Sequence, residues 1–505
     1  MTTLSSRGAG ETINRDLEQR YDTVAYAAQA NPQSHPTHLA TVATLLGLAP
    51  PAVRTARVLE VGCSDGANLL PMAAGLPDAR FVGIDLSGQA IGEARRGAEA
   101  LSLSNVAFLQ QDLATLAADE PFDYVIAHGF YSWVPAHVRD ALFDLARRRL
   151  APSGILFVSL NVYPGCHVRE AAWQMLHHHV DGIADPYARM DAARAFARLL
   201  AEPHVTQTET DAFLRNELTR IANTTDSALF HDDLAVPNEP VYFHQFAAHL
   251  ARYDLAYLAE AKLSMMTAAG LTPNMQQFVA GLDRLAREQY LDFARLRRFR
   301  QSLACRADAV PSGLDPTERA AGMHVAASMP LVRAAAEGRA FAEELPVGDA
   351  NAHAARRLLQ WLVAQSPRIV PVAEAVAWQR QNAADDANAA RPAAVLLAEA
   401  CYAGTADLFT HPPGLAPAAG ERPIASPVAR WQARRQSNLT NLRHEPLRLD
   451  DPVALAVLVL LDGTRTRSEV AAMLAPLLPD AERHDAQRRL ATYLSQFALH
   501  GLIVA

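Results

Sequence analysis

Between residues 57 and 161 the chain alternates short apolar runs with longer segments whose apolar residues recur at helical spacing. Short runs rich in Val, Ile and Leu are typical of buried strands, and the longer segments are typical of amphipathic helices. The pattern predicts strands at 57–61, 80–84, 106–109, 123–127 and 155–160, and helices near 67–75, 88–100 and 137–149, with a weaker one around 113–117. Such alternation predicts a parallel sheet in the order 3-2-1-4-5, with right-handed crossovers and helices on both faces.

The pattern changes after the fifth strand. Residues 168–230 are helical and alanine-rich, and a further helix at 242–253 precedes an apolar strand at 255–260. We interpret that helix and strand as the last ones of the same sheet, which makes the preceding helical stretch an insert above the carboxyl ends of the strands. Residues 270–345 are again interpreted as helical, with the arginines of LRRFRQSL (296–303) on a solvated face.

Two later segments share one plan of three helices, a glycine and a short strand. The first runs from RRLLQWLVAQSP to Gly404 and the following strand, and the second from VALAVLVLLDGT to Gly501 and the chain end. This order is that of a winged helix, and the Pro/Gly-rich stretch 411–427 between the two segments is typical of a linker. The predicted fold class is therefore α/β: a Rossmann-like sheet with a helical insert, followed by helical and winged-helix C-terminal domains.

These elements predict six parts of the chain. They are a flexible N-terminus (1–20), a cofactor-binding core with an N-terminal lid (21–165), a helical insert (166–230), a return to the core (231–263), a helical regulatory middle region with a winged-helix-like unit (264–415) and a C-terminal winged-helix-like domain (416–505).

Composition limits the classes of binding partner and indicates the cellular location of the protein. The 505 residues carry a net charge of −8 without any block of like charges, which argues against a nucleic acid or an anionic membrane as the main partner. The four cysteines lie far apart, so neither a zinc ribbon nor a disulfide framework is indicated, and we expect no metal. The N-terminus lacks a signal-peptide pattern, and no apolar run reaches 18 residues, so we expect a soluble, cytoplasmic protein.

Candidate chemistry begins at the turn after the first strand, VLEVGCSDGANLL (58–70). Its spacing is Glu-x-Gly-x-x-x-Gly, and an acid before the turn would repel the phosphates of a dinucleotide but attract the ammonium of S-adenosylmethionine. Asp85 ends the second strand, 23 residues after Gly62, where such folds place the acid that accepts the ribose hydroxyls. Asp112 ends the third strand and is placed to meet the adenine. The predicted cofactor-binding residues are Glu60, Gly62, Cys63, Ser64, Gly66, Asn68, Asp85, Leu86, Asp112, Leu113 and His128.

The ends of the fourth and fifth strands supply polar and aromatic residues that would flank a methyl donor. HGFYSWVP (128–135) and NVYPGC (161–166) predict an acceptor pocket shaped by Tyr131, Trp133, Asn161 and Tyr163. Aromatic rings attract a sulfonium, although aromatics after strands are also common in cores. Further candidates are a lid (Tyr21, Tyr26, His35, His38) and the loop His231-Asp232-Asp233, which returns from the insert.

Several of these stretches together resemble a known family. YDTVAY, HPTHLA, VLEVGCSDGANLLPMA, FVGIDLS, AHGFYSWVP, NVYPG, HDDLAVPNEPVYFHQF, RQSLAC, SPVARWQA, NLRHEPL and LLDGTR are similar to bacterial class I methyltransferases that carry a methyltransferase regulatory domain. That family includes the protein-lysine methyltransferases of outer-membrane surface proteins. The resemblance implies S-adenosylmethionine as cofactor, a middle regulatory region and a C-terminal winged-helix region. Cys166 stands where members often have an aromatic residue, which bears on the substrate rather than on the cofactor.

Three function classes compete on these grounds. The first is N-methylation of lysine side chains in a protein substrate, such as a cell-surface protein. The second is methyl transfer to a small-molecule acceptor or to another protein side chain. The third, a DNA-binding regulator, is disfavoured because the third helix of the first winged-helix-like segment, AVLLAEACYAG, has no Lys or Arg. Whether the protein forms a homodimer stays open. Since no cofactor motif lies in 420–505, we expect removal of this region to leave cofactor binding nearly intact.

Overall fold

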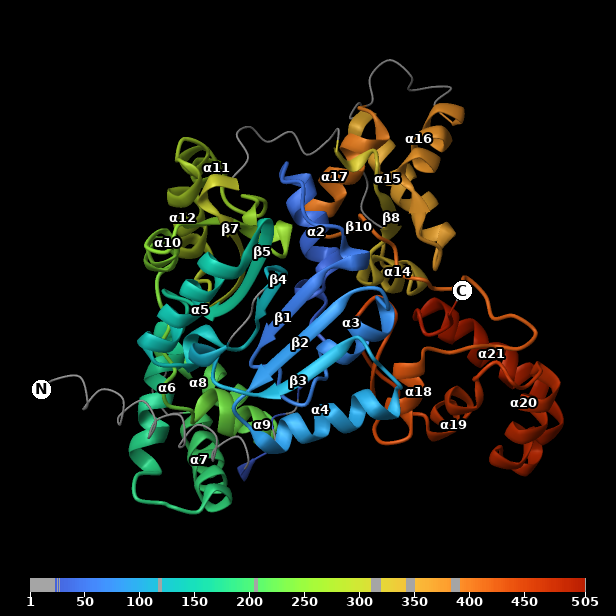
Figure 1. Cartoon of the computed structure of the whole chain (residues 1–505), viewed down its shortest axis with the longest axis horizontal. Helices are drawn as coiled ribbons and strands as arrows, with labels where there is room; N and C mark the ends of the chain where they lie inside the picture. The colour runs from blue at the N-terminus through green and yellow to red at the C-terminus, as the bar shows by residue number, and fades with distance from the viewer. Residues whose placement is uncertain are drawn as a thin grey trace, which may run out of the picture.

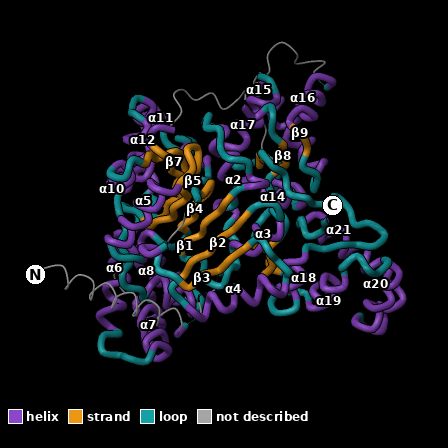
Figure 2. The backbone as a smooth tube through the Cα atoms, viewed as in Figure 1, coloured by secondary structure: helices purple, strands orange, loops and turns teal. Residues whose placement is uncertain are grey.

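The computed structural model describes residues 23–24, 26, 28–116, 120–203, 208–309, 319–341, 350–382 and 391–504. Within these residues, seven strands form the central sheet in the order β3-β2-β1-β4-β5-β7-β6 (Figures 1 and 2). They are β1 (Arg57–Val61), β2 (Arg80–Asp85), β3 (Val106–Gln110), β4 (Phe122–Ala127), β5 (Leu150–Asn161), β6 (Leu255–Glu260) and β7 (Phe299–Arg306). The predicted order 3-2-1-4-5 is confirmed, and these strands are parallel.

Helices cover both faces of the sheet because the strands bury side chains on both sides. On one face Val58, Phe81 and Phe157 pack with the helices α2 (Pro36–Leu45), α3 (Leu69–Gly75) and α4 (Gly88–Ala100). On the other face Leu59 and Val158 pack with α5 (Ala136–Arg149) and α10 (Phe243–Ala251). Adjacent residues of a strand thus pack into the hydrophobic cores on opposite faces of the sheet. This explains why the strands are apolar throughout and do not alternate apolar with polar residues.

Strand β7 corrects the sequence analysis. The stretch LRRFRQSL was interpreted as a solvated helical face, but Phe299–Arg306 is an antiparallel strand between β5 and β6. Its Arg300 is 1% exposed and bonds to Glu260, Glu288 and Asp292. The charge is buried because carboxylates surround it, a pairing between distant segments that no local periodicity reveals. The helices α11 (Pro273–Ala280) and α12 (Arg284–Arg295) lie in this region as expected.

The predicted insert is helical and has a core of its own. It comprises α6 (Cys166–His179), α7 (Pro186–Ala201), α8 (Glu209–Ala222), α9 (Asp226–Ala228) and the short π-helix η5 (Leu229–Asp233). Apolar residues such as Leu176, Ala193 and Ile221 form a cluster separate from the sheet. None of the helices in the described residues is both long and apolar enough to cross a membrane.

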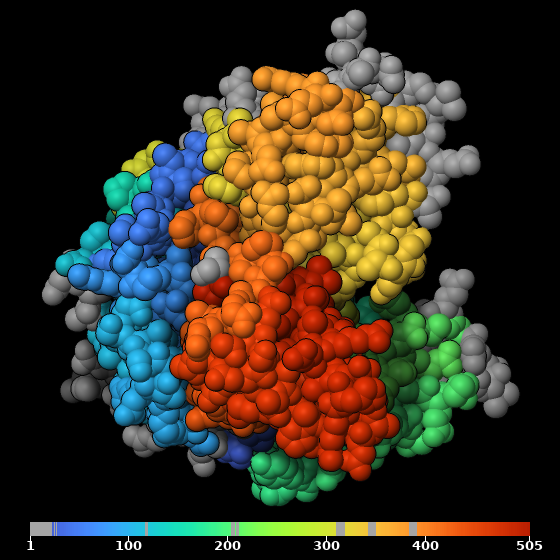
Figure 3. Space-filling model, turned by 90° about the vertical axis from the view of Figure 1, so that its right-hand side faces the viewer, coloured from blue at the N-terminus to red at the C-terminus, as the bar shows by residue number. Residues whose placement is uncertain are grey.

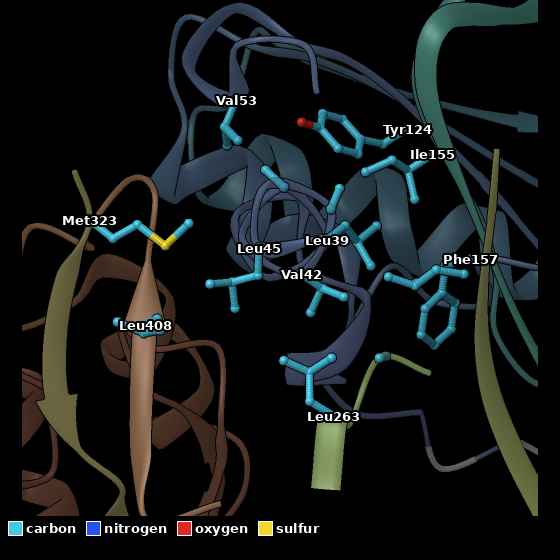
Figure 4. Close-up of a cluster of buried hydrophobic side chains, with 14 of the residues drawn as sticks. Leu39, Val42, Leu45, Val53, Tyr124, Ile155, Phe157, Leu263, Met323 and Leu408 are labelled. Atoms are coloured by element: carbon cyan, nitrogen blue, oxygen red, sulfur yellow. The ribbon is translucent and has the colours of Figure 1, made fainter. Parts of the chain in front are cut away.

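The middle of the chain shares a core with the sheet. It contains β8 (His324–Ala327), α14 (Met329–Ala336), α15 (Ala350–Gln365), β9 (Val370–Pro371), α16 (Val372–Gln381), α17 (Ala393–Ala403) and β10 (Ala406–Phe409), with the strands paired in the order β10-β8-β9. Figure 4 shows Leu45 of α2 lying between Ile155 of the sheet and Leu408 of β10, and all three belong to one buried cluster. The helices and the strand after Gly404 appear as predicted.

The C-terminal unit has a separate core and docks on the side of the sheet that carries α3 and α4 (Figure 3). It contains α18 (Pro427–Ala433), β11 (Asn438–Thr440), β12 (Pro446–Arg448), α19 (Pro452–Leu460), α20 (Arg467–Leu474) and α21 (Ala486–Leu499). Trp431 of α18 lies beside Gly97 of α4. Short 3-10 turns complete the chain: η1 (Pro32–Ser34), η2 (Val53–Thr55), η3 (Leu113–Thr115), η4 (Tyr131–Trp133), η6 (Leu263–Met266), η7 (Ala307–Ala309), η8 (Ala475–Leu477) and η9 (Asp480–Asp485).

Candidate active site

The turn between β1 and α3 is shaped by its two glycines. Gly62 has a φ of +72° and its N–H donates to the Ile84 carbonyl at 2.8 Å, which ties the turn to β2. Gly66 has a φ of +75°, and a Cβ there would lie 2.8 Å from the ring of Phe108. A left-handed φ strains any other residue. Gly66 therefore serves the close packing of the turn and, unlike Gly62, does not line the cavity beside it.

A cavity of about 290 Å³ opens at the carboxyl ends of β1, β2 and β4, on the edge that the sheet topology predicts. We call it the cofactor cavity. Of the predicted cofactor-binding residues, those that line it are Glu60, Gly62, Cys63, Ser64, Asn68, Asp85, Leu86, Asp112, Leu113 and His128. Residues from four separate segments of the chain are thus brought to one space.

Asp85 and Asp112 are held in place by backbone N–H groups. The two carboxylate oxygens of Asp85 accept from the N–H of Ser64 and of Ser87, each at 2.9 Å. Asp112 caps η3 by accepting from the N–H of Ala114 at 2.9 Å. An acid oriented in this way needs no side-chain rearrangement to accept from a ligand hydroxyl.

Glu60 is the most unusual charge in the cavity. Its side chain is buried, and Oε1 accepts from the Asn68 amide at 2.6 Å, whereas Oε2 has no hydrogen-bond partner among the described residues. Burial, reinforced by Asp85 and Asp65, raises the pKa of Glu60 to about 8. A buried carboxylate oxygen left open in a cavity fits a cationic group of a ligand. These carboxylate acceptors therefore fit the ammonium and the ribose hydroxyls of S-adenosylmethionine.

His128, at the end of β4, faces the same space as a neutral ring. Burial lowers its pKa to about 4, and the Asn31 amide nitrogen lies 3.0 Å from its Nδ1. Asn31 also donates its backbone N–H to the Asn68 side chain at 2.8 Å. The segment before α2 is therefore hydrogen-bonded to two predicted cofactor residues.

Only Trp133 of the four predicted acceptor residues lines the cavity. Tyr131, two positions earlier in the turn η4, packs against Phe143 and Phe246 and shares a hydrogen bond of 2.8 Å with His249. Residues two apart in a 3-10 turn point in different directions, so one ring enters the core and the other faces the cavity. The expectation that Tyr131 faces the acceptor is corrected by this placement. Phe130, which the sequence analysis passed over, lines the cavity instead.

Asn161 and Tyr163 also lie outside the cavity lining. Asn161 donates from its amide to Asn238 at 2.9 Å, and Asn238 donates to the Asp232 carbonyl at 3.1 Å. Asn161 thereby supports the loop that carries Asp232 rather than facing an acceptor. The Tyr163 hydroxyl donates to Glu170 at 3.0 Å, and its ring stacks on His167. Position after a strand therefore did not by itself predict which side chain reaches the cavity.

The loop that returns from the insert supplies the opposite wall. His231 and Asp232 line the cavity, while Asp233 is buried against Arg169 and Arg220. Burial and the neighbouring Asp233 raise the pKa of Asp232 to about 6. The insert therefore contributes to the cavity through η5 at its C-terminal root.

The lid candidates divide between two cavities. Tyr26 lines the cofactor cavity, with its ring 5.4 Å from that of His231. His35 and His38 line a second cavity of about 390 Å³ between α2, the middle unit and the C-terminal unit, where His35 caps α2. Tyr21 lies outside the described residues. Other residues that line the cofactor cavity include Asp65, Ser87 and Gln111, each next to a predicted position in the chain, and Gln29.

Comparison with known proteins adds three family matches. "Methyltransferase domain" matches residues 58–154, "Predicted methyltransferase regulatory domain" matches 225–306, and "PKMT, C-terminal winged helix domain" matches 421–491. The regulatory match covers α10, β6, α12 and β7, which complete the sheet, whereas the sequence analysis put the regulatory region at 264–415. The domain so named is therefore part of the methyltransferase sheet in this chain.

Two curated relatives come from Rickettsia prowazekii (strain Madrid E). The uncharacterised protein RP789 is 35% identical over 291 residues, which are 57% of this chain and 53% of the relative, so the chain spans about half of its length. The uncharacterised protein RP028 is 32% identical over 238 residues, 46% of this chain and 94% of the relative. Among solved structures, PKMT2 from Rickettsia typhi in complex with AdoHcy has a TM-score of 0.81 at 22% identity, covering 95% of this chain and 100% of that one. That likeness shows a shared fold.

Proposed function

Because the chain belongs to the bacterial class I methyltransferases that carry a methyltransferase regulatory domain, we propose that it transfers methyl groups from S-adenosylmethionine to lysine side chains of a protein substrate. The observation that carries the proposal is the cofactor cavity, in which the open oxygen of Glu60 and the oriented carboxylate of Asp85 face one space. The winged-helix match and the fold shared with PKMT2 support a protein acceptor, since PKMT is the abbreviation of protein-lysine methyltransferase.

The chain's own residues bind and orient the reactants. Glu60 would hold the ammonium of the cofactor, Asp85 the ribose hydroxyls and Asp112 the adenine edge. S-adenosylmethionine, when bound, supplies a methyl group on a positively charged sulfur, which is already a strong electrophile. The protein's contribution is then to position the nucleophile and to exclude water, effects that supply about 7–11 kcal/mol in well-oriented reactions.

A lysine amine must lose a proton before it attacks, because its ordinary pKa is about 10.4. Trp133 and Phe130 line an apolar part of the cavity, and desolvation there would lower the pKa of an entering amine. Asp232 lines the same cavity, and its raised pKa of about 6 suits a group that accepts a proton and passes it to solvent. We assign the acceptor side to Trp133, Phe130 and Asp232.

The test is the transfer of labelled methyl groups. The protein is incubated with methyl-labelled S-adenosylmethionine and, in parallel, with a cell-envelope protein fraction, a soluble protein fraction and a small-molecule extract. We expect label in protein, and mass spectrometry should place it on lysine. Asp85→Ala is the background control, since it removes an acid of the cofactor cavity.

Each fraction decides between acceptor classes. Label on lysine in the envelope fraction would support a cell-surface protein as the substrate. Label confined to small molecules, or to protein side chains other than lysine, would contradict lysine methylation and support the alternative acceptor. Absence of label in every fraction, with no binding of S-adenosylhomocysteine, would contradict the activity itself.

A further inference from the structure

One side chain of the C-terminal unit, His444, contacts Asn68, a residue that lines the cofactor cavity. The strands β11 and β12 pair as a hairpin, and residues 441–445 form its tip. The Asn441 side-chain oxygen accepts from the backbone N–H of Arg443 and of Glu445, at 2.9 and 2.8 Å. These bonds fix a turn in which His444 has a φ of +63°. The turn presents the His444 ring away from its own hairpin and toward the methyltransferase sheet.

His444 is 3% exposed, and its Nε2 lies 2.8 Å from the side-chain oxygen of Asn68, 376 residues earlier in the chain. An amide oxygen only accepts hydrogen bonds, so Nε2 carries the proton and donates. Burial, with a contribution from the His35 ring 5.1 Å away, lowers the pKa of His444 well below its usual value. The ring is therefore neutral, with its hydrogen on Nε2.

This bond completes the hydrogen bonding of the Asn68 amide. The oxygen accepts from the Asn31 N–H at 2.8 Å and from His444, and the amide nitrogen donates to Ser34 Oγ at 3.0 Å and to Glu60 Oε1 at 2.6 Å. Two acceptor positions and two donor hydrogens are thus all used. Rotation of the amide by 180° would turn its oxygen toward Glu60 and its nitrogen toward two donors. The His444 bond therefore helps to keep an N–H pointing at Glu60.

We propose that His444 is a positioning residue of the methyl-donor site: it holds the Asn68 amide in the orientation that anchors Glu60, so that the carboxylate presents its second oxygen to the ammonium of the cofactor. The inference rests on the proposed function in one respect, that the cofactor cavity binds the methyl donor. It makes the C-terminal unit a structural part of that site. The expectation that removal of 420–505 leaves cofactor binding nearly intact did not take this contact between distant segments into account, and the proposal predicts weaker binding after the removal.

The test measures S-adenosylhomocysteine binding by calorimetry on the full chain. His444→Leu keeps a buried apolar side chain but removes the donor, and we expect about a tenfold loss of affinity, the effect of one hydrogen bond lost with its acceptor left buried. His444→Gln carries an amide nitrogen that can donate to Asn68, and it should restore the affinity to within about threefold of wild type. Rescue by the donor distinguishes positioning from simple packing.

Arg443→Leu is the matched control. Arg443 is the neighbouring residue in the same turn, its side chain is 5% exposed, and it contacts Pro367 and Asp407 rather than Asn68. We expect it to perturb the docking of the hairpin while the affinity stays within about threefold of wild type. If Arg443→Leu weakens binding as much as His444→Leu, or if His444→Gln is as weak as His444→Leu, the effect is general destabilisation and the proposal is overturned.

A double-mutant cycle gives an independent check. If His444 acts through Asn68, Asn68→Ala combined with His444→Leu should bind S-adenosylhomocysteine as Asn68→Ala alone does. Additive losses would overturn the proposal. Wild-type binding separates this inference from its premise: no binding by the wild type would contradict the proposed function, whereas wild-type binding with an unchanged His444→Leu variant would contradict the role of His444 alone.

Discussion

Two glutamates near the ends of buried strands have the same exposure and different surroundings. Glu60 in β1 and Glu260 in β6 are each 3% exposed. Glu260 accepts from Arg300 at 2.6 Å, from the Ser302 hydroxyl at 2.7 Å and from the Gln301 N–H at 3.3 Å, so both of its oxygens are used. Glu60 accepts from one amide through one oxygen, and its second oxygen is unpartnered among the described residues.

The difference separates a structural charge from a binding charge. A buried carboxylate without a partner is costly, so a fold that retains one gains something other than stability. Glu260 joins β6, β7 and α12 through Arg300, while Glu60 faces a cavity. Burial alone would not distinguish them, and the open oxygen does.

The largest effect is expected at the arginine that pairs Glu260. Arg300→Leu would remove the guanidinium that Glu260, Glu288 and Asp292 share, and removal of one partner of a buried pair costs about 3–5 kcal/mol of the free energy of unfolding. Urea unfolding followed by circular dichroism measures the loss. Arg298→Leu is the control, because Arg298 directly precedes the same strand. Its side chain is 55% exposed, and its ion pair with Glu217 is worth at most about 1 kcal/mol. Equal losses in both variants would contradict a special role for the buried cluster.

Asp85 has both a ligand-binding and a structural role, since it lines the cofactor cavity and also accepts hydrogen bonds from backbone N–H groups. Asp85→Ala should weaken S-adenosylhomocysteine binding about a hundredfold, because two ribose hydroxyls lose a charged acceptor and the glycine turn loses the acceptor of the Ser64 N–H. Calorimetry gives the affinity, and a thermal melt shows whether the turn loosens. An unchanged affinity would mean that the ribose binds elsewhere.

Glu60→Gln and Glu260→Gln form the direct test of the contrast. Glu60→Gln should weaken S-adenosylhomocysteine about tenfold, because the charge facing the ammonium is lost, and should leave the free energy of unfolding unchanged or higher. Glu260→Gln should do the reverse, lowering stability by about 1–3 kcal/mol with little change in affinity. Both variants are measured by calorimetry and urea unfolding. A loss of affinity in Glu260→Gln, or a loss of stability in Glu60→Gln, would contradict the assignment of a structural role to one glutamate and a binding role to the other.

The pH dependence of Glu60 follows from its raised pKa. Between the ordinary value of 4.5 and about 8, folded Glu60 holds a proton that the unfolded chain has released, so its contribution to stability falls as pH rises through this window. A cationic ligand needs the carboxylate, so affinity should rise with pH toward 8. Calorimetry at pH 7 in buffers of different ionisation enthalpy should show release of about one proton on S-adenosylhomocysteine binding, and Glu60→Gln should release none. Equal release by both proteins would assign the proton to another group.

The smallest effect is expected at Tyr131. Tyr131→Phe removes the hydrogen bond to His249 and should cost about 1 kcal/mol of stability, while affinity and turnover stay within about twofold. Trp133→Ala, from the same turn, should instead lower turnover about tenfold because its ring lines the cavity. Single-turnover rates and thermal melts distinguish the two. A loss of turnover in Tyr131→Phe would instead support the original expectation that Tyr131 contributes to the acceptor pocket.

By itself, the sequence determined the parts that depend on local pattern. The alternation of apolar runs predicted β1 to β5 and their order, and the acids at the strand ends predicted most of the cavity, because parallel strands bring their carboxyl ends to one edge. The spacing of Gly62 and Gly66 predicted the turn, since a left-handed φ favours glycine.

Only the tertiary structure decided which of those residues share an environment. Arg300 of β7 looked solvated because its carboxylate partners lie on β6 and α12, and no local period encodes that pairing. Tyr131 and Trp133 occupy one turn, and the packing around it sends one ring to the core and the other to the cavity. His444 meets Asn68 across 376 residues. Burial and hydrogen-bond pairing are properties of the folded neighbourhood, so the chemistry of a side chain is decided by contacts that its own segment does not contain.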